Sequence, residues 1–390
     1  MAKHALLSAS SASRWMKCTP SARLTEKMAD TSSVYAQEGT LAHELGELEL
    51  KRELELIAKR TYNAELKKIK AHELYGADMP DYVGIYTDYV MEKLAEAKSR
   101  SSDALVFLEQ KLDFSDWVPE GFGTGDTVII SDGVIEIVDL KYGKGVPVSA
   151  EWNPQMMLYG LGAWSEYDFL YDLHTVRMTI AQPRLDNIST FEIKADELVD
   201  WAEKTLKPAA EKAWEGAGEL CAGEHCMFCK VKATCKERAE YNLKVLADYR
   251  NADSELLSKH LLTPGDVSRI LGLAMEIKNW LKDVEEHALG KALEGFKFPG
   301  FKLVEGRSNR TYMDEVIVAN VLVKEGLSEE EIYNKKIKGI TDMEKKLGGK
   351  KRFIEVLGDY IIKPPGKPTL VDESDKRPEF DSAADDFNLE

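Results

Sequence analysis

Two short runs of apolar residues joined by a turn constrain the fold of this chain most strongly. Residues 127–130 and 134–138 are rich in valine, isoleucine and threonine, and Ser131-Asp132-Gly133 separates them. Short β-branched runs on either side of such a turn are typical of an antiparallel β-hairpin. Further strands are predicted at residues 105–108, 175–182 and 191–193. The middle of the chain should therefore form a β-sheet.

Patterns of helical spacing surround these strands in the sequence. Helices are predicted at residues 8–24, 40–58, 80–97, 153–165, 195–215 and 264–293. A short hairpin is predicted near residues 302–307, and several shorter helices between residues 313 and 357. Strands in the centre and helices before, between and after them predict an α/β core with a mainly helical appendage.

The length of the chain indicates more than one structural unit. A chain of 390 residues is too long for one small core, so we expect a large domain and an appendage. We predict a large domain over residues 1–240 and a mainly helical C-terminal domain over residues 241–363. Pro, Gly, Asp and Ser dominate from residue 364, which predicts a disordered acidic tail over residues 364–390.

The charge and hydropathy of the chain exclude some classes of protein. A formal net charge of −16 argues against a protein that coats nucleic acid by bulk electrostatics, but allows an enzyme with a local basic groove. No apolar run approaches the roughly 20 residues that cross a bilayer, and the N-terminus has no apolar signal segment. We expect a cytoplasmic protein with no membrane partner.

Two aspartates and a lysine flank the predicted hairpin. Asp126 precedes its first strand, and Asp139 and Lys141 end its second strand. Because side chains alternate along a strand, Asp139 and Lys141 should share one face, and the pairing of the strands can bring Asp126 near them. Carboxylates of this kind bind Mg²⁺, and a neighbouring lysine can position a water nucleophile. Taken alone, the same residues could simply cap an exposed strand end.

Three further motifs accompany this one in a recognisable order. A histidine ends Gly39-Thr-Leu-Ala-His43, and an aspartate ends Gly123-Thr-Gly-Asp126. Asp139-Leu-Lys141 follows, and Gln155-Met-Met-Leu-Tyr159 lies on the next predicted helix. In order and spacing, residues 8–240 resemble the RecB-like branch of the PD-(D/E)xK nucleases. That resemblance implies a restriction-endonuclease-like core, which is a central mixed sheet flanked by helices.

The resemblance also implies a role for each motif residue. A bound Mg²⁺ or Mn²⁺ would be held by His43, Asp126, Asp139 and the Leu140 backbone carbonyl. Lys141 would position the attacking water.

The helix that follows the D-x-K motif would support the site. Gln155 and Tyr159, one helical turn apart, would contact DNA or brace the site. Glu109, on the strand before Asp126, is a candidate additional acid, although an exposed-strand role is the favoured interpretation.

The cysteines form a second cluster of potential metal ligands. Cys226, Cys229 and Cys235 give the spacing C-x2-C-x5-C, which suits a soft metal. Cys221 or His225 could complete a local zinc site.

A distant fourth cysteine gives the favoured alternative. Cys18, about two hundred residues upstream, could complete a 4Fe-4S cluster with Cys226, Cys229 and Cys235, and Cys221 would then be spare. This arrangement resembles the iron–sulfur staple of AddB-type and CRISPR-adaptation nucleases. A free buried thiol is the simpler interpretation of Cys18.

Together these features predict a metal-dependent deoxyribonuclease, in the first instance an exonuclease. The whole chain also resembles an uncharacterised family of phage-encoded proteins, which implies a role in phage DNA processing or recombination. The alternatives are a catalytically inactive DNA-binding or scaffolding protein, and an interaction module built from the cysteines and the acidic tail. The expected partners are DNA and, at the acidic tail, a recombination or single-strand-binding protein. The basic segment 335–352 could contact the DNA backbone or form a solvated helical face, and the tail could equally be a solubilising end.

Overall fold

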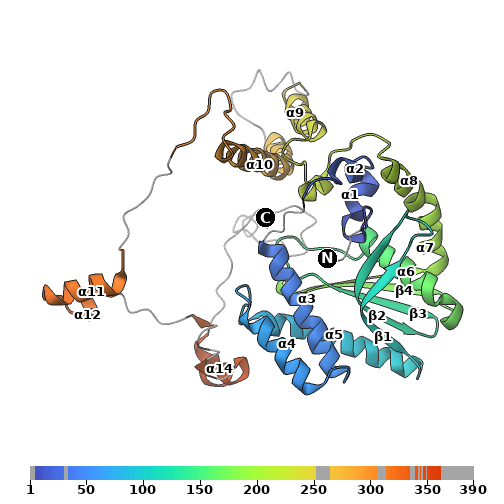
Figure 1. Cartoon of the computed structure of the whole chain (residues 1–390), viewed down its shortest axis with the longest axis horizontal. Coiled ribbons are helices and arrows are strands. Elements are labelled where there is room, and N and C mark those ends of the chain that lie inside the picture. Colours follow the sequence, from blue (N-terminus) through green and yellow to red (C-terminus); the bar gives the residue numbers. More distant parts are fainter. Residues whose placement is uncertain are drawn as a thin grey trace, which may run out of the picture. The chain divides into compact units, whose positions relative to one another are not determined.

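The computed structural model describes residues 5–29, 34–251, 264–304, 313–333 and parts of 339–361. The chain divides into two compact units, Met1–Gly290 and Lys291–Glu390, each of which is considered by itself. The first unit contains the sheet and all the motifs named above. Figure 1 shows this sheet between layers of helices.

A five-stranded mixed sheet forms the centre of the first unit. Its strands follow the order β1-β2-β3-β4-β5. Only the β3–β4 pair is parallel, and the other three pairs are antiparallel. The strands are β1 (Leu105–Asp113), β2 (Phe122–Ser131), β3 (Val134–Leu140), β4 (Thr175–Gln182) and β5 (Asn187–Lys194). The prediction of a central mixed sheet flanked by helices is therefore confirmed.

The parallel pair requires a crossover, and helix α6 (Pro154–Tyr171) provides it. The side chain of Asn153 accepts hydrogen bonds from the first amides of this helix, and Pro154 occupies its first turn. The helix ends where Asp172 adopts the left-handed conformation. These local signals start α6 beside the end of β3, so its first turns lie next to the D-x-K motif.

Helices cover both faces of the sheet (Figure 1). Ile135 and Ile137 of β3 belong to the large core that includes α6, whereas Val138 contacts the core that includes Tyr86 and Val90 of helix α5 (Met79–Arg100). Alternating residues of one strand thus bury against different helices. Helices α3 (Val34–Glu53) and α4 (Lys59–Ala71) extend the α5 layer.

The N-terminal helices pack against the segment that follows the sheet. They are η1 (Ala9–Ser11), α1 (Ala12–Lys17) and α2 (Ser21–Thr25). Both α1 and α2 pack against α8 (Lys207–Glu215), and α1 also packs against η4 (Glu224–Phe228). The helix α7 (Ala195–Trp201) and the π-turn η3 (Ala202–Leu206) lead from the sheet to α8. Figure 1 shows α1 and α2 beside α8. Trp15 is fully buried here and donates a hydrogen bond to the Ser8 carbonyl at 3.0 Å.

A buried arginine joins the last two helices of the first unit. Arg238 of α9 (Lys236–Asn251) is 1% exposed, and it contacts Asp283 at 2.6 Å and Glu276 at 3.0 Å on α10 (Pro264–Leu293). The second unit contains α11 (Glu315–Lys324), α12 (Glu329–Ile332), α14 (Lys350–Leu357) and η5 (Gly358–Tyr360). The 3-10 turn η2 (Pro183–Leu185) lies between β4 and β5.

Several predicted bounds differ from the observed ones. The strand expected to begin after Asp126 begins at Phe122, so Asp126 lies within β2. The helix predicted at residues 40–58 spans Val34–Glu53, and α4 follows it as a separate helix. Residues 8–24 form three short helical segments instead of one.

Other sequence predictions are not decided by the structure. The predicted domain boundaries at residues 240 and 363 stay predictions. The tail over residues 364–390 and much of the basic segment 335–352 lie outside the described residues. A hairpin was predicted near residues 302–307. Residues 301–304 have no regular structure, and the remainder of that hairpin lies outside the described residues. Within the described part of the chain, no helix has the length and apolar character that spanning a bilayer demands.

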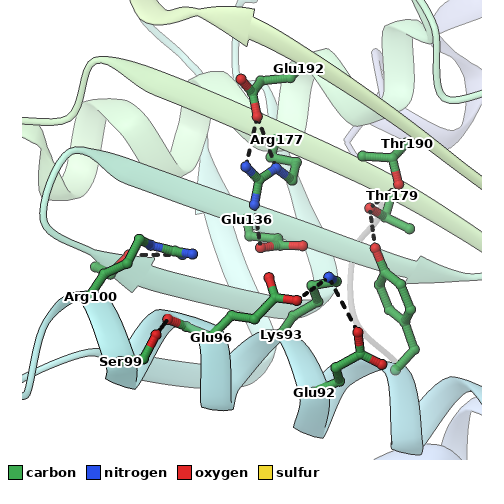
Figure 2. Close-up of polar contacts among 12 residues, drawn as sticks. Glu92, Lys93, Glu96, Ser99, Arg100, Glu136, Arg177, Thr179, Thr190 and Glu192 are labelled. Carbon is green, nitrogen blue, oxygen red and sulfur yellow. Dashed lines mark hydrogen bonds and ion pairs between the residues drawn. The ribbon is translucent and has the colours of Figure 1, made fainter.

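A buried glutamate in the sheet is paired with cationic neighbours. Glu136 of β3 is 1% exposed, and its carboxylate lies 3.3 Å from Arg177 of β4. Figure 2 shows Arg177 between Glu136 and Glu192, with Lys93 of α5 on the other side of Glu136. Burial raises the pKa of Glu136, while Arg177 and Lys93 act to lower it. The charged form is therefore held in the fold at a cost that the cations partly offset.

We expect Arg177→Met to destabilise the protein by about 3 kcal/mol at pH 7, because it leaves a buried carboxylate without its main partner. The pKa of Glu136 in the folded state is already above its ordinary value of 4.5 and should rise further. Protonation of Glu136 then favours the folded state. The stability lost in Arg177→Met should therefore be largest above neutral pH and should disappear below about pH 4.5. Chemical denaturation across this pH range measures it. An Arg177→Met/Glu136→Gln protein should regain most of the loss, and a pH-independent defect would contradict this explanation.

Candidate active site

Asp126 lies at a local break in the sheet. Strands β1 and β2 pair regularly up to Leu108–Thr127 and again from Gln110–Gly125. Between these pairs, Glu109 and Asp126 lie opposite one another but are not paired. Glu109 has a left-handed backbone, with φ of 49°. Phe107 stacks on Tyr167 of α6, and Gln110 also contacts that tyrosine, although residues three apart on a regular strand face opposite sides. The break therefore shifts the alternation of side chains at these two acids.

Two hydrogen-bonding groups fix the Asp126 side chain. The Leu140 amide donates to Asp126 Oδ2 at 2.7 Å, and His43 Nδ1 lies 3.2 Å from the same oxygen. His43 belongs to α3, whose buried residues Leu41 and Leu45 pack in the helical layer and hold it in place. Burial acts to lower the pKa of His43, but Asp126 outweighs it and the pKa is raised.

The backbone of Leu140 faces the same acid. Its amide points to Asp126, whereas the next amide, that of Lys141, points the other way and donates to the Ala181 carbonyl of β4 at 2.8 Å. The N–H and C=O groups of one strand residue lie on the same edge. The Leu140 carbonyl is therefore on the Asp126 side of β3, where the sequence predicted a metal ligand.

Asp139 is the buried acid of the site. It is 2% exposed and forms an ion pair with Lys141 Nζ at 2.8 Å. Its other oxygen accepts a hydrogen bond from Gln155 Nε2 at 3.3 Å, and the same amide group donates to Tyr159 Oη at 3.1 Å. Both residues come from α6. The last residue pair of β2 with β3 is Thr127–Val138, so Asp126 and Asp139 occupy the next register position.

The structure thus places all seven sequence-predicted residues in one neighbourhood. They come from α3, β2, the end of β3 and the first turns of α6. The residues are His43, Asp126, Asp139, Leu140, Lys141, Gln155 and Tyr159.

Glu109 is the residue for which sequence reasoning favoured another role. Ligand atoms of His43, Glu109 and Asp126 all lie within 4.8 Å of one another. An imidazole and two carboxylates at this separation suit a divalent cation. Glu109 is exposed, as expected, but its carboxylate also faces the other two groups. Only the register of β1 against β2 shows this, because no spacing along the sequence relates Glu109 to Asp126.

The site holds more carboxylates than cations to balance them. Burial raises the pKa of Asp139, and Asp126 adds to the effect while Lys141 opposes it. Partial loss of hydration, together with Asp126, raises the pKa of Glu109 to about 7. Burial acts to lower the pKa of Lys141, but Asp139 and Asp126 outweigh it, so the ammonium stays charged. A bound cation would relieve the remaining repulsion.

The cysteines form a separate cluster. Cys18 and the four cysteines near residue 230 line one narrow cavity together with His225. The Cys221 amide donates to Cys18 Sγ at 3.4 Å, and His225 Nε2 contacts the Cys221 carbonyl oxygen at 2.8 Å. The fold thus brings Cys18 to residues that are about two hundred positions away in the sequence.

The separation of the sulfurs bears on the kind of metal they could hold. Among the described residues, His43, Glu109 and Asp126 make up the one group of three or more ligands whose atoms lie within 4.8 Å, so no three cysteine sulfurs are that close. A tetrahedral zinc ion, with Zn–S bonds of about 2.3 Å, holds its sulfurs roughly 3.8 Å apart. Three of the described cysteine sulfurs would therefore have to move closer together to hold one zinc ion.

Two solved structures are similar to part of this chain. A candidate exonuclease from Eubacterium rectale is 12% identical, with a TM-score of 0.33, over 60% of this chain and 87% of its own. The protein SSO0001 is 14% identical, with a TM-score of 0.21, over 58% of this chain and 96% of its own. Likenesses at this level establish neither a shared fold nor a shared activity. Residues 4–378 match a family described as a protein of unknown function, and the chain therefore belongs to the DUF2800 family.

Proposed function

We propose that the protein is a metal-dependent deoxyribonuclease of the RecB-like PD-(D/E)xK class, acting as an exonuclease. One observation carries the proposal. His43 of α3, Asp126 of β2, and Asp139 and Lys141 at the end of β3 converge on one point, where the Asp126–His43 and Asp139–Lys141 contacts are 3.2 and 2.8 Å. A role in phage DNA processing or recombination follows from the resemblance of the sequence alone. Partners other than DNA stay predictions.

The donor set fits Mg²⁺ or Mn²⁺. His43, Asp126, Asp139 and the Leu140 carbonyl would hold the ion, with Glu109 as a further ligand that the 4.8 Å group supports. When bound, the ion would polarise the scissile phosphate and make a water molecule a better nucleophile. The excess of carboxylates over cations in this site supports a cation here.

The protein's own side chains would orient the reactants. The Lys141 ammonium, held 2.8 Å from Asp139, would contact the attacking water or the phosphate and balance charge that develops on it. Gln155 would keep Asp139 in its orientation through the 3.3 Å hydrogen bond. Tyr159 anchors Gln155 in turn, and its ring packs against the β2 backbone at Gly123.

The cysteine cavity is part of the proposal. Cys18, Cys226, Cys229 and Cys235 would hold a 4Fe-4S cluster, which would join the N-terminal helices to the segment after α8. The common cavity, which Cys18 lines together with the three later cysteines, supports this assignment. Such a group would stabilise the fold and need take no part in hydrolysis.

We expect Lys141→Ala and Asp139→Asn to lower the rate of DNA cleavage at least about 100-fold, because the first removes the cation that would contact the water or phosphate and the second removes a charged ligand of the ion. Cleavage of end-labelled linear DNA and of circular DNA, each single- and double-stranded, with Mg²⁺ or Mn²⁺, measures this loss. Resistance of the circular substrates would identify an exonuclease. Lys98→Ala, on the exposed surface of α5, is the matched control and should cleave normally. Wild-type rates in either site variant, with circular dichroism showing intact folding, would refute the proposal.

Glu109→Gln should weaken Mn²⁺ binding roughly tenfold or more, because it removes a charged ligand. Calorimetric titration of the purified protein with Mn²⁺ measures the affinity directly. Glu120→Gln is the matched control, since Glu120 is also an exposed glutamate with a left-handed backbone but lies outside the site. Equal affinities in the two variants would mean that Glu109 is not a ligand.

Protein purified without oxygen should be brown and contain about four iron atoms and four sulfides per chain. Cys18→Ser should lose both the colour and most of the iron, whereas Cys221→Ser should retain them. Iron and sulfide analysis, with visible absorption, provides the measurement. A colourless wild-type protein that contains one zinc ion would favour the local zinc site instead.

A further inference from the structure

A groove separate from the candidate active site runs between the N-terminal helices and the segment that follows α8. Residues far apart in the sequence line it, including four serines of residues 8–13 and the first residue of β2. The side chains with most to offer a ligand are cationic or aromatic. They are Arg14, Arg23, Lys230, Phe122, Trp214 and Phe228.

Phe228 is the most unusual of these residues. Its side chain is 82% exposed, although it lies in η4 between the buried residues Cys226 and Cys229. The turn is short and both its neighbouring cysteines are buried, so the ring is presented to solvent from a fixed position. An exposed aromatic ring at the edge of a cationic groove is a platform on which an unpaired base can stack.

The three cations are also held in fixed positions. Arg23 stacks over the Trp214 ring at 4.6 Å, and its Nε donates to the Trp214 carbonyl at 2.6 Å. Arg14 donates a hydrogen bond to Thr25 Oγ1 at 3.0 Å. Lys230 Nζ donates one to the Met28 carbonyl, in the turn after α2, at 2.8 Å.

These cations gather in a chain whose formal net charge is −16. Glu26, which pairs with Arg23 at 3.2 Å, and Glu120 are the acids among the lining residues. A local excess of fixed cations beside hydroxyl groups favours a phosphate backbone over an apolar ligand.

Strand β2 connects the groove to the candidate active site. Phe122 lines the groove, and Asp126 lies four residues along the same strand, a distance of about 13 Å. Between them, a side chain added at Gly123 would lie 2.7 Å from the Tyr159 ring and 3.3 Å from Ala9. The two regions therefore share a wall.

We infer that this groove binds single-stranded DNA, with one base stacked on Phe228 and the phosphates contacting Arg14 and Lys230. The strand would continue along β2 to the acids at residues 126 and 139. The inference rests on the proposed function, because it names the form of DNA that reaches that site. A base paired in a duplex has no free face to stack on Phe228, so the groove selects single strands.

The test measures binding without cleavage. Full-length protein carrying Lys141→Ala is titrated into a fluorescently labelled oligothymidylate, and into a labelled duplex of the same length, and anisotropy gives the affinities. Adding Phe228→Ala should weaken oligothymidylate binding about five- to 100-fold, with little effect on the duplex. Phe228→Trp should restore binding. Phe169→Ala, which removes a 90% exposed phenylalanine from the end of α6, should leave binding unchanged.

Iron content and visible absorption of the Phe228→Ala protein show whether the cysteine segment is intact. Oligothymidylate binding that is unchanged in Phe228→Ala, or equally weakened in Phe169→Ala, overturns the inference. A different outcome would refute the nuclease proposal alone. Wild-type protein would then bind single strands through Phe228 but hydrolyse neither the oligothymidylate nor the duplex with Mg²⁺ or Mn²⁺. In that case the inference about the groove would hold, and the protein would bind DNA without cleaving it.

Discussion

The hydrogen bond from the Leu140 amide to the Asp126 carboxylate is the contact on which the candidate site depends. It forms only because β2 and β3 pair in a register that ends just before these residues. Asp126 is thereby turned toward the end of β3, where Asp139 and Lys141 lie. Pairing of β1 with β2 is interrupted at Glu109 and Asp126, which allows the Asp126 side chain to point toward β3. On a regular strand the alternation of side chains would direct Asp126 toward the core.

Burial gives this arrangement its chemistry. Asp139 is almost fully buried and Asp126 is close to it, so the two charges repel one another in a poorly hydrated place. Lys141 neutralises one of them, and a divalent cation is the natural partner for the rest. Glu136, three residues before Asp139 on the opposite face of β3, illustrates the contrast: it is equally buried, but Arg177 balances it and no ligand is required.

The packing of α1 and α2 against α8 connects the other two features of the first unit. It brings Cys18 to the later cysteines and, on the same side, forms the groove that Arg14 and Phe228 line. One packing arrangement therefore creates both the cysteine cavity and the groove, which reaches the first residue of β2. A group that joins the cysteines would also fix the exposed ring of Phe228.

Local sequence patterns determined the elements of this protein, and tertiary structure decided which of them meet. The strand at residues 175–182 and the helix at residues 264–293 were predicted with their observed bounds, because the period of apolar residues is a local property. The D-x-K motif was visible for the same reason, whereas His43 and Cys18 had meaning only through resemblance to other proteins. Glu109 was a candidate acid whose favoured role lay elsewhere, since its place beside Asp126 depends on strand register and on a left-handed backbone. Contacts between distant segments are set by packing of the whole core, which no window of the sequence contains.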